Sequence, residues 1–354
     1  MKWYILRRVA WAAFASLVIL SITFVLMDLV PDQRIMEAAW QADLADLDRD
    51  QAIQAEEQRR GLDRSFSERY VDFMFSMIRG DWGWSLEYSQ PVWDTIVQTA
   101  PYSLMYGIPA IILSTIVGTA IGLYSAVNQY TKKDYAATFF AFFGISIPNF
   151  WFAIIMLVIF GTMLGWVDVN WNHYQVLSQD GSWTMLERTD DTHRAFIGEE
   201  FEGERYVGVL SPANLKQLIL PVFVLGTSST AVVMRYARAE ALEYVDADFV
   251  KTAKAKGVSN WSIVAKHIFR PASIPLMTIF VGRMLGLIMF GSYLIEVVFG
   301  IPGLGLASFE AILRQDTDLV AATILVPTFL AIFGNLVEDI MYAILDPRID
   351  YSDR

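Results

Sequence analysis

TIVQTAPYSLMYGIPAIILSTIVGTAIGLYSAVNQYT, residues 95–131, contains no charged side chain. A helix needs about 20 consecutive apolar residues to cross the hydrocarbon core of a bilayer, and this stretch exceeds that length. A similar run from about residue 272 to 295 carries a single charge, Arg283. The other uncharged runs cover residues 9–27, 135–167, 217–234 and 319–337. The sequence therefore predicts an all-α integral membrane protein with six transmembrane helices.

The composition supports a membrane protein and shows where the acidic residues belong. Apolar residues make up 55% of the chain, there is no Cys, and the net charge is −11. An acid at the bilayer centre costs about 2.5 to 3.5 kcal/mol, so the acids are expected outside the spans. Residues 31–99 hold fourteen Asp or Glu against seven Arg, and residues 166–216 hold nine against four Lys or Arg. These two segments are predicted to be acidic loops.

The basic residues predict the orientation of the chain. Lys and Arg are retained preferentially on the cytoplasmic side of short connections. They occur in the N-terminus, at Lys132 and Lys133, and throughout residues 235–270. Both termini are therefore expected in the cytoplasm and both acidic loops outside. The first span is expected to be retained, since Met27-Asp28-Leu29-Val30 offers no small-residue cleavage site.

The first acidic loop contains a predicted amphipathic helix. Ser65 and Glu68 have the spacing of a capping box, and apolar residues then recur at helical period before Gly80. Such a helix lies on the outer membrane surface, forms a docking site for a partner, or packs on the transmembrane bundle.

The segments expected from these patterns divide the chain as follows. Residues 1–30 form the N-terminus and first span, 31–94 the first extracytoplasmic loop, 95–345 the membrane core and 346–354 a cytoplasmic tail. Within the core, spans are expected at about 95–128, 135–166, 215–235, 272–298 and 319–344, with an extracytoplasmic loop at 167–214 and a cytoplasmic loop at 236–271.

The cytoplasmic loop predicts a short helix at residues 249–256. Asp248 is placed to cap its start, Gly257 to adopt the left-handed conformation after its end, and Ser259 to cap a second helix. A helix of this length is marginal alone in water, because nucleation costs more than so few hydrogen bonds return. It is therefore expected to be docked.

Two stretches of this loop carry a resemblance to a known family. "DFVKTAKAKG" at 248–257 and "KHIFRPASIP" at 266–275 resemble the EAA motif of ABC importer permeases. In that family the short helix is the coupling helix, seated on a cytoplasmic ATPase subunit. The residues that would couple this chain to the ATPase are Asp248, Phe249, Val250, Lys251, Thr252, Ala253, Lys254, Ala255, Lys256, Gly257 and Pro271.

Further stretches resemble the B-type subunit of the dipeptide and oligopeptide permeases. They are "WYILRRV" (3–9), "GLDRSFSERY" (61–70), "IRGDWGWSL" (78–86), "GISIPNFW" (144–151), "LKQLILPVFVLG" (215–226), "VFGIPGLGLASFEAIL" (298–313) and "YAILDPRIDY" (342–351). The second outer loop departs from the resemblance, being longer and more acidic.

The resemblance implies a type I ABC importer permease fold in the cell membrane. It also implies three kinds of partner: a second, homologous permease, two ABC ATPase subunits that hold ATP and Mg, and an extracytoplasmic substrate-binding protein. The mechanism would be alternating access. Peptides are the expected substrates, with sugars and metal chelates as alternatives within the same family.

Other classes of function find little support in the residues. There is no Gly-x-x-x-x-Gly-Lys-Ser/Thr phosphate loop, and His173, His193 and His267 are too scattered for a metal site. No catalytic residue, metal site, bound cofactor or nucleic-acid partner is therefore expected. An ion-driven secondary transporter should show internal repeats, and none is found; a membrane scaffold would not need the short cytoplasmic helix.

Several residues within spans are candidates for special roles. Arg283 and Glu338 are predicted at similar depth, so they either form an ion pair or Arg283 lines the pathway. Pro148, Pro221 and Pro327 interrupt spans and either serve gating or make static kinks. Gly118 and Gly122 form a Gly-x-x-x-Gly pattern, which is typical of a close helix crossing.

Overall fold

The computed structural model describes residues 2–30, 33–167, 173–178, 183–187, 200–201, 204–208, 212–273, 276 and 293–345. The chain divides into two compact units: Met1–Thr99 with Ala307–Arg354, and Ala100–Leu306. We call them the first and the second unit and describe each by itself.

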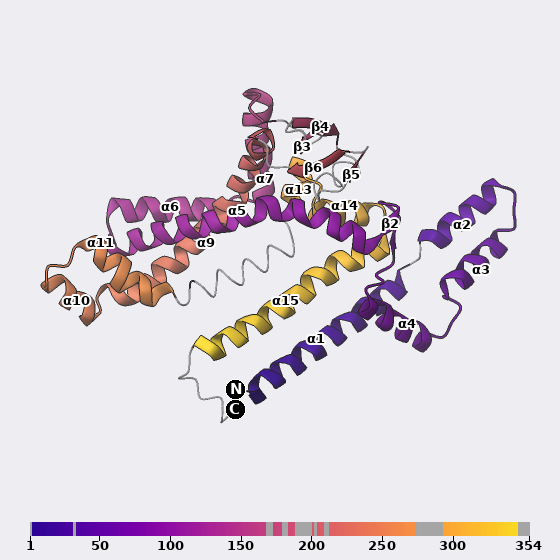
Figure 1. Ribbon diagram of the computed structural model, residues 1–354, viewed down its shortest axis with the longest axis horizontal. Coiled ribbons are helices and arrows are strands. Elements are labelled where there is room, and N and C mark those ends of the chain that lie inside the picture. Colours follow the sequence, from indigo (N-terminus) through magenta and orange to yellow (C-terminus); the bar gives the residue numbers. More distant parts are fainter. Residues whose placement is uncertain are drawn as a thin grey trace. The chain divides into compact units, whose positions relative to one another are not determined.

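The first unit is built around two long helices. α1 (Lys2–Leu29) and α15 (Thr317–Leu345) lie side by side and run in opposite directions (Figure 1). After α1 come three shorter helices: α2 (Gln33–Leu44), α3 (Arg49–Arg60) and α4 (Phe66–Arg79). A two-stranded hairpin, β1 (Trp84–Ser85) with β2 (Gln90–Pro91), precedes α5 (Val92–Val127).

The predicted amphipathic helix is confirmed as α4. The Ser65 hydroxyl accepts a hydrogen bond from the Glu68 amide, and the Glu68 carboxylate accepts one from the Ser65 amide, so the capping box is complete. These hydrogen bonds from Ser65 hold the pKa of Glu68 below its ordinary value. Gly80 ends the helix in the left-handed conformation. The helices α2 and α3 in the same loop were not foreseen.

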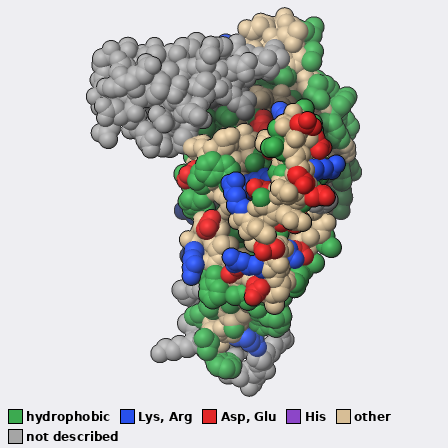
Figure 2. All heavy atoms as spheres, turned by 90° about the vertical axis from the view of Figure 1, so that its right-hand side faces the viewer, with side chains coloured by type: hydrophobic (Ala, Val, Ile, Leu, Met, Phe, Trp, Pro, Cys, Tyr) green, Lys and Arg blue, Asp and Glu red, His purple; other side chains and the backbone are tan. Residues whose placement is uncertain are grey.

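Charged side chains of both signs cover the short helices of the first unit. Figure 2 shows them intermingled on the side where α2 and α3 lie in Figure 1. Exposed pairs such as Arg64 with Asp72, at 2.8 Å, are part of this surface. The acidic excess of the segment is therefore dispersed among basic groups and stays solvated, in agreement with its expected place outside the spans.

The second unit contains most of the remaining long helices and several short ones. α6 (Lys132–Ser146) packs along α9 (Pro212–Val245), and most of α5 lies beside them (Figure 1). α7 (Asn149–Met156) continues into a π-helical segment, η1 (Leu157–Met163). Then follow α10 (Asp248–Ala255), α11 (Asn260–Ser262), the π-helical η2 (Ile263–Ile268) and α13 (Tyr293–Phe299). The helix α14 (Leu304–Leu313) begins in the second unit and continues into the first.

The predicted spans are found in part. Four described helices are long and apolar enough to cross a membrane: α1, α5, α9 and α15. The predicted span at 135–166 is instead a pair, α6 and α7 with η1, bent by 96°. A second bent pair, α13 and α14, meets at 87°, and most of the predicted span at 272–298 lies outside the described residues. The chain is thus mostly helical, with four to six candidate spans.

The bend between α6 and α7 has a local cause. Pro148 has no amide hydrogen, and its ring disfavours a helical conformation for the residue before it. Ile147 is accordingly extended, with φ −89° and ψ 123°, and Pro148 caps the start of α7.

The second outer loop contains β structure, so the prediction that the chain is purely α-helical was wrong in this region. β3 (His173–Ser178) and β4 (Trp183–Glu187) pair antiparallel, and β5 (Glu200–Phe201) pairs with β6 (Glu204–Gly208). The four strands form one sheet in the order β4-β3-β6-β5. The Asp180-Gly181 dipeptide between β3 and β4 is a common hairpin signal.

Candidate functional site

The first candidate site is centred on α10, which begins one residue earlier than predicted. The capping residue is Ala247, whose backbone is extended and whose side chain makes no cap hydrogen bond. The prediction that Asp248 caps the helix was therefore wrong. Asp248 is already helical, and its exposed carboxylate lies 3.3 Å from the Lys251 ammonium. Its charge still favours the helix start, where the backbone dipole is positive.

The end of α10 follows the prediction. Gly257 has φ +76°, a left-handed conformation that residues with a side chain rarely adopt. Its amide donates to the Lys254 carbonyl, and the Val258 amide donates to the Ala253 carbonyl. No atom lies within 4 Å of the position that a Cβ at Gly257 would occupy, so the requirement for glycine here is conformational and not steric. Ser259 caps α11, as predicted.

One face of α10 is docked on the chain's own helices. Val250 and Ala253 are buried in an apolar cluster with residues of α5, α9 and η2. These neighbours are Leu123, Ala126, Ala241, Ile263 and Ile268. The helix was expected to need docking, and this cluster supplies part of it from within the chain.

The opposite face of α10 is exposed and basic. Phe249 has 48% of its surface accessible, and Lys251, Thr252, Lys254 and Lys256 are all exposed. An exposed aromatic ring beside three ammonium groups, on a helix held rigidly from behind, is suited to contact another protein. The candidate coupling residues are thus divided between an inward apolar face and an outward face that carries the charge.

The structure describes only some of the remaining candidate residues. Pro271 lies in the helical turns after η2, while Arg283 and the side chain of Glu338 lie outside the described residues. The Arg283–Glu338 ion pair therefore stays a prediction. Pro221 and Pro327 lie inside the continuous helices α9 and α15, and only Pro148 stands at a sharp bend.

Sequence reasoning missed a buried ion pair where α5, α6 and α9 meet. The side chain of Asp134, on α6, is 3% exposed, and that of Arg238, on α9, is 27% exposed. The guanidinium donates from Nε and Nη2 to the two carboxylate oxygens, at 3.0 Å each. The Ser125 hydroxyl, on α5, also donates to Asp134, as does the Tyr130 amide in the turn before α6. A lone acid directly after Lys132 and Lys133 was the available signal.

A second missed site surrounds Glu296 on α13, whose side chain is fully buried. Its carboxyl accepts hydrogen bonds from the hydroxyls of Ser103 and Tyr106 on α5, both at 2.7 Å. It also accepts from the amides of Gly305 and Leu306, at 2.7 and 3.0 Å. Those amides belong to the first turn of α14, where helix donors have no partner within the helix. Glu296 thus caps α14 and holds the bend between α13 and α14.

The glycines of this bend are required by the buried carboxyl. A Cβ at Gly303 would clash with the Glu296 carboxyl and lie 2.5 Å from the Ser103 hydroxyl. A Cβ at Gly305 would lie 2.8 Å from the Tyr293 Cα. The Gly-rich stretch at 300–305 forms this turn, with Gly300 left-handed at φ +65°.

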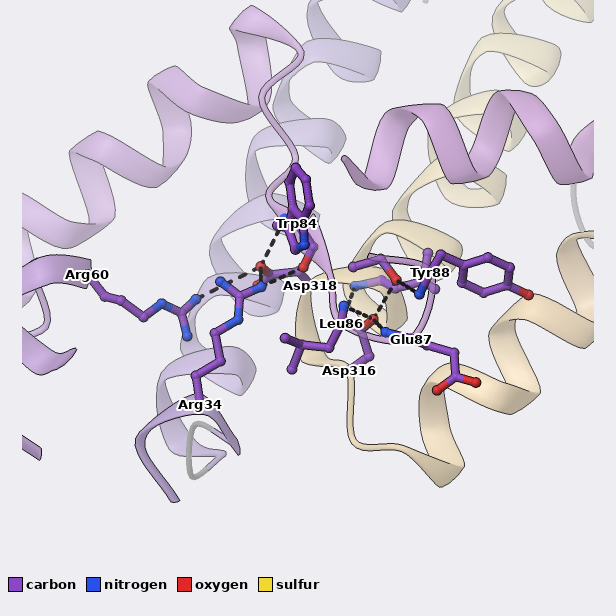
Figure 3. A network of polar contacts seen from close by, with 10 residues as sticks. Arg34, Arg60, Trp84, Leu86, Glu87, Tyr88, Asp316 and Asp318 are labelled. Atoms are coloured by element: carbon purple, nitrogen blue, oxygen red, sulfur yellow. Dashed lines mark hydrogen bonds and ion pairs between the residues drawn. The ribbon is translucent and has the colours of Figure 1, made fainter. Parts of the chain in front are cut away.

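The first unit has its own buried carboxylate, at the start of α15. Asp316 is 1% exposed and accepts hydrogen bonds from the Ser85 hydroxyl and the Leu86 amide, at 2.7 and 2.8 Å. The Glu87 amide donates to the same oxygen, and the Leu319 amide to the other. Figure 3 shows the β1–β2 turn wrapped around this side chain. Asp316 therefore anchors the turn and caps α15 at once.

Asp318 extends the same network on its other side. It accepts a hydrogen bond from the Trp84 amide and lies 3.3 Å from Arg34 and 3.9 Å from Arg60, as Figure 3 shows. A Cβ at Gly83 would lie 2.6 Å from its carboxylate, so glycine is needed for the strand to approach. The stretch at 78–86, which carried part of the family resemblance, is thus held by two aspartates.

Comparison with known proteins gives the family. Residues 118–351 match the model of the binding-protein-dependent transport system inner membrane component. An oligopeptide transport system permease protein of Bacillus subtilis is 30% identical over 349 residues, 98% of this chain and 99% of the relative. This chain belongs to that family of inner membrane components.

Two other relatives of the transport component cover nearly the whole chain. A dipeptide transport system permease protein of Escherichia coli is 29% identical over 350 residues, 99% of both chains. A putative peptide transport system permease protein of Brucella suis is 31% identical over 351 residues, 98% of this chain and 99% of the relative. The resemblance noted from the motifs is confirmed.

Membership places the chain in a transport system as a multi-pass membrane component. The matched range includes α10, the Asp134–Arg238 pair and Glu296. The candidate sites of this transport component thus include contacts that join its helices and the exposed face of α10.

Proposed function

We propose that this chain is the permease subunit of an ABC importer for peptides, and that α10 couples it to partner ATPase subunits. The peptide substrate is supported by the names of the relatives, which are oligopeptide, dipeptide and peptide transport permeases. The coupling role is supported by α10 itself, with its apolar face buried and its basic face exposed.

In the proposed machine the chain has six spans and pairs with a second, related permease. Two ATPase subunits hold ATP and Mg on the cytoplasmic side, and a substrate-binding protein delivers peptide from outside. ATP binding moves α10, and α10 moves the helices on which Val250 and Ala253 are packed. Transport then follows from a difference in contacts between two states, which is what coupling requires.

The burial of α10 makes this proposal physically reasonable. A short helix on a flexible tether would move without moving anything else. Because Val250 and Ala253 belong to the same apolar cluster as residues of α5, α9 and η2, a displacement of α10 is expected to pass through that cluster to the longer helices. Close-packed interiors transmit such displacements because they have few voids to absorb them.

The proposal is tested by co-purification of the chain with its ATPase. Reversing the exposed charges with Lys251→Glu and Lys254→Glu should abolish co-purification and ATP-driven transport, while the chain still inserts in the membrane. The matched control makes the same charge change on α3, with Arg49→Glu and Arg59→Glu, whose side chains are 62% and 81% exposed. Equal loss of the ATPase in both variants, or in neither, contradicts a coupling role for α10.

A second pair of variants tests the shape of α10 separately from its charge. Gly257→Val should weaken ATPase binding, because a β-branched residue is strained at φ +76°. Gly257→Asn should largely retain it, because Asn tolerates the left-handed conformation. Peptide specificity is tested on the companion substrate-binding protein, by titration with dipeptides and longer peptides and with sugars as the comparison.

A further inference from the structure

The helix α4 has a wider apolar face than its packing in the first unit uses. Phe66, Tyr70 and Phe73 lie on one side of the helix and surround Phe24 of α1, with ring centroids 5.2 to 5.4 Å apart. A second strip of the helix, formed by Val71, Phe75 and Ile78, is exposed.

The exposed strip is apolar along its whole length. Val71, Phe75 and Ile78 recur at the spacing of one helix face and have 47%, 54% and 77% of their surface accessible. Charged residues occupy a different arc of the same helix, at Glu68, Asp72 and Arg79. A helix divided in this way is typical of segments that lie at a membrane surface with one face in the lipid.

The contacts of α4 place it at the depth of a lipid leaflet. The Tyr70 hydroxyl is 2.8 Å from the Ser21 hydroxyl of α1, and Arg69 pairs with Asp28. At 1.5 Å per residue, Ser21 lies roughly 12 Å inside the end of α1 at Leu29. The hydrocarbon core is about 30 Å thick, so this contact falls within one leaflet.

The neighbouring surface of α1 favours lipid as the occupant. At the same depth Ile22, Val25 and Leu26 of α1 are 55%, 42% and 59% exposed. These side chains belong to a helix that is long and apolar enough to cross a membrane, so acyl chains are the expected neighbours of their exposed surface. The strip belongs to a helix that packs against this part of α1, so lipid is the expected cover of both apolar surfaces.

We propose that α4 is an interfacial helix whose strip of Val71, Phe75 and Ile78 is inserted among the acyl chains of the leaflet in which α1 ends. Phe24 and its aromatic neighbours fix the helix to α1 on one side, and lipid covers the other. Arg79, with its guanidinium 5.7 Å from the Phe75 ring centroid, lies at the border between the strip and the charged arc. From there its charged end reaches the headgroups while its stem covers apolar surface.

The absence of Cys from the sequence makes a direct test possible. Val71→Cys, Phe75→Cys and Ile78→Cys each introduce a single thiol for a nitroxide spin label. Asp72→Cys is the matched control, because Asp72 is next to Val71 in sequence and lies on the charged arc. The full chain, co-expressed with its partner subunits, is reconstituted in vesicles of phosphatidylethanolamine and phosphatidylglycerol. Collisions of each label with oxygen and with a water-soluble nickel chelate are then measured.

Insertion in lipid predicts a several-fold higher ratio of oxygen to nickel collisions at all three strip positions than at Asp72→Cys. Labels on the strip that collide readily with nickel would show the strip in water and overturn the proposal. Labels shielded from both reagents would show a protein on the strip, which also overturns it. The three positions are read independently, so one variant that fails to assemble does not decide the result.

Discussion

Gly122 lies where α5 packs on α9, and its lack of a side chain allows the two helices to approach closely. A Cβ at this position would lie 2.7 Å from the Ala237 Cβ and 2.7 Å from the Met234 carbonyl oxygen, both on α9. Gly118 makes the same approach one turn earlier, 2.8 Å from the Thr230 carbonyl oxygen. The Gly-x-x-x-Gly pattern therefore marks a real close packing of α5 on α9, as the sequence indicated.

Gly122→Val is expected to lower stability by about 1 to 3 kcal/mol, because the added atoms force the two helices apart. Thermal unfolding of the detergent-purified chain measures the loss. Gly226→Ala, on α9, is the control, since the nearest atom to its added Cβ is the Ala110 carbonyl oxygen, 3.9 Å away. A midpoint for Gly122→Val equal to that of Gly226→Ala would show that the crossing is looser than described.

Glu296 is the residue on which the bend between α13 and α14 depends. Glu296→Leu removes the acceptor of four donors, and each buried donor left without a partner costs about 1 to 3 kcal/mol. A large fall in the unfolding temperature is expected, with a smaller fall for Glu296→Gln, which keeps one acceptor oxygen. Glu310→Leu is the control, because Glu310 accepts from the Tyr88 hydroxyl and is only partly buried. Glu296→Leu should lower the unfolding temperature clearly more than Glu310→Leu does. Similar unfolding temperatures for the two variants would count against the capping role.

At the scale of elements, the Asp134–Arg238 pair joins α6 to α9. Breaking a buried pair from one side costs about 3 to 5 kcal/mol, because the other charge stays buried without compensation. Asp134→Ala and Arg238→Ala are each expected to be strongly destabilising, and the double variant should lose less than the sum. A double-mutant cycle on thermal unfolding measures the coupling.

The exposed pair Asp248–Lys251 on α10 is the comparison for that cycle. Its side chains are 99% and 64% exposed, so solvent screens the attraction and the pair is worth about 1 kcal/mol or less. Fully additive effects for Asp134 and Arg238 would indicate that each stabilises the bundle through other neighbours.

The short elements differ in how well the sequence predicts them. The helix α4 was predicted with its cap and its end, because Ser65, Glu68 and Gly80 determine it locally. The start of α10 was misplaced by one residue, since Asp248 was assigned to the cap that Ala247 occupies. The strands β3 to β6 were missed, because a loop was expected from charge alone and the strand alternation was not weighed.

At the scale of the whole molecule, the proposed orientation makes a direct prediction about which residues water-soluble reagents reach. Lys254→Cys on α10 should react with a membrane-impermeant maleimide only in inside-out vesicles. Asp50→Cys on α3 should react in intact cells, because the acidic loop is expected outside. Both residues are exposed in this chain, and expressing it without its ATPase keeps the face of α10 accessible for the comparison. Labelling of both from the same side would reject the arrangement inferred from the basic residues.

The two units contribute different parts of the proposed machine. The second unit contains α10 together with the ion pair and the buried glutamate that join its helices. The first unit contains α1, α15 and the helix α4, which we place at the membrane surface. The buried carboxylates Asp316 and Glu296 each cap a helix and anchor a turn, one in each unit.

The sequence by itself predicted the membrane class, the long apolar helices, the amphipathic helix α4 and the short helix that became α10. Each of these depends on hydrophobicity, charge or capping within a few neighbouring residues, which a single sequence displays. Only the tertiary structure decided that Asp134 meets Arg238, that Glu296 caps α14, and that Val71, Phe75 and Ile78 face away from α1. Those outcomes depend on which distant residues fold to the same place, and a buried polar group reveals its partner only when both are in position.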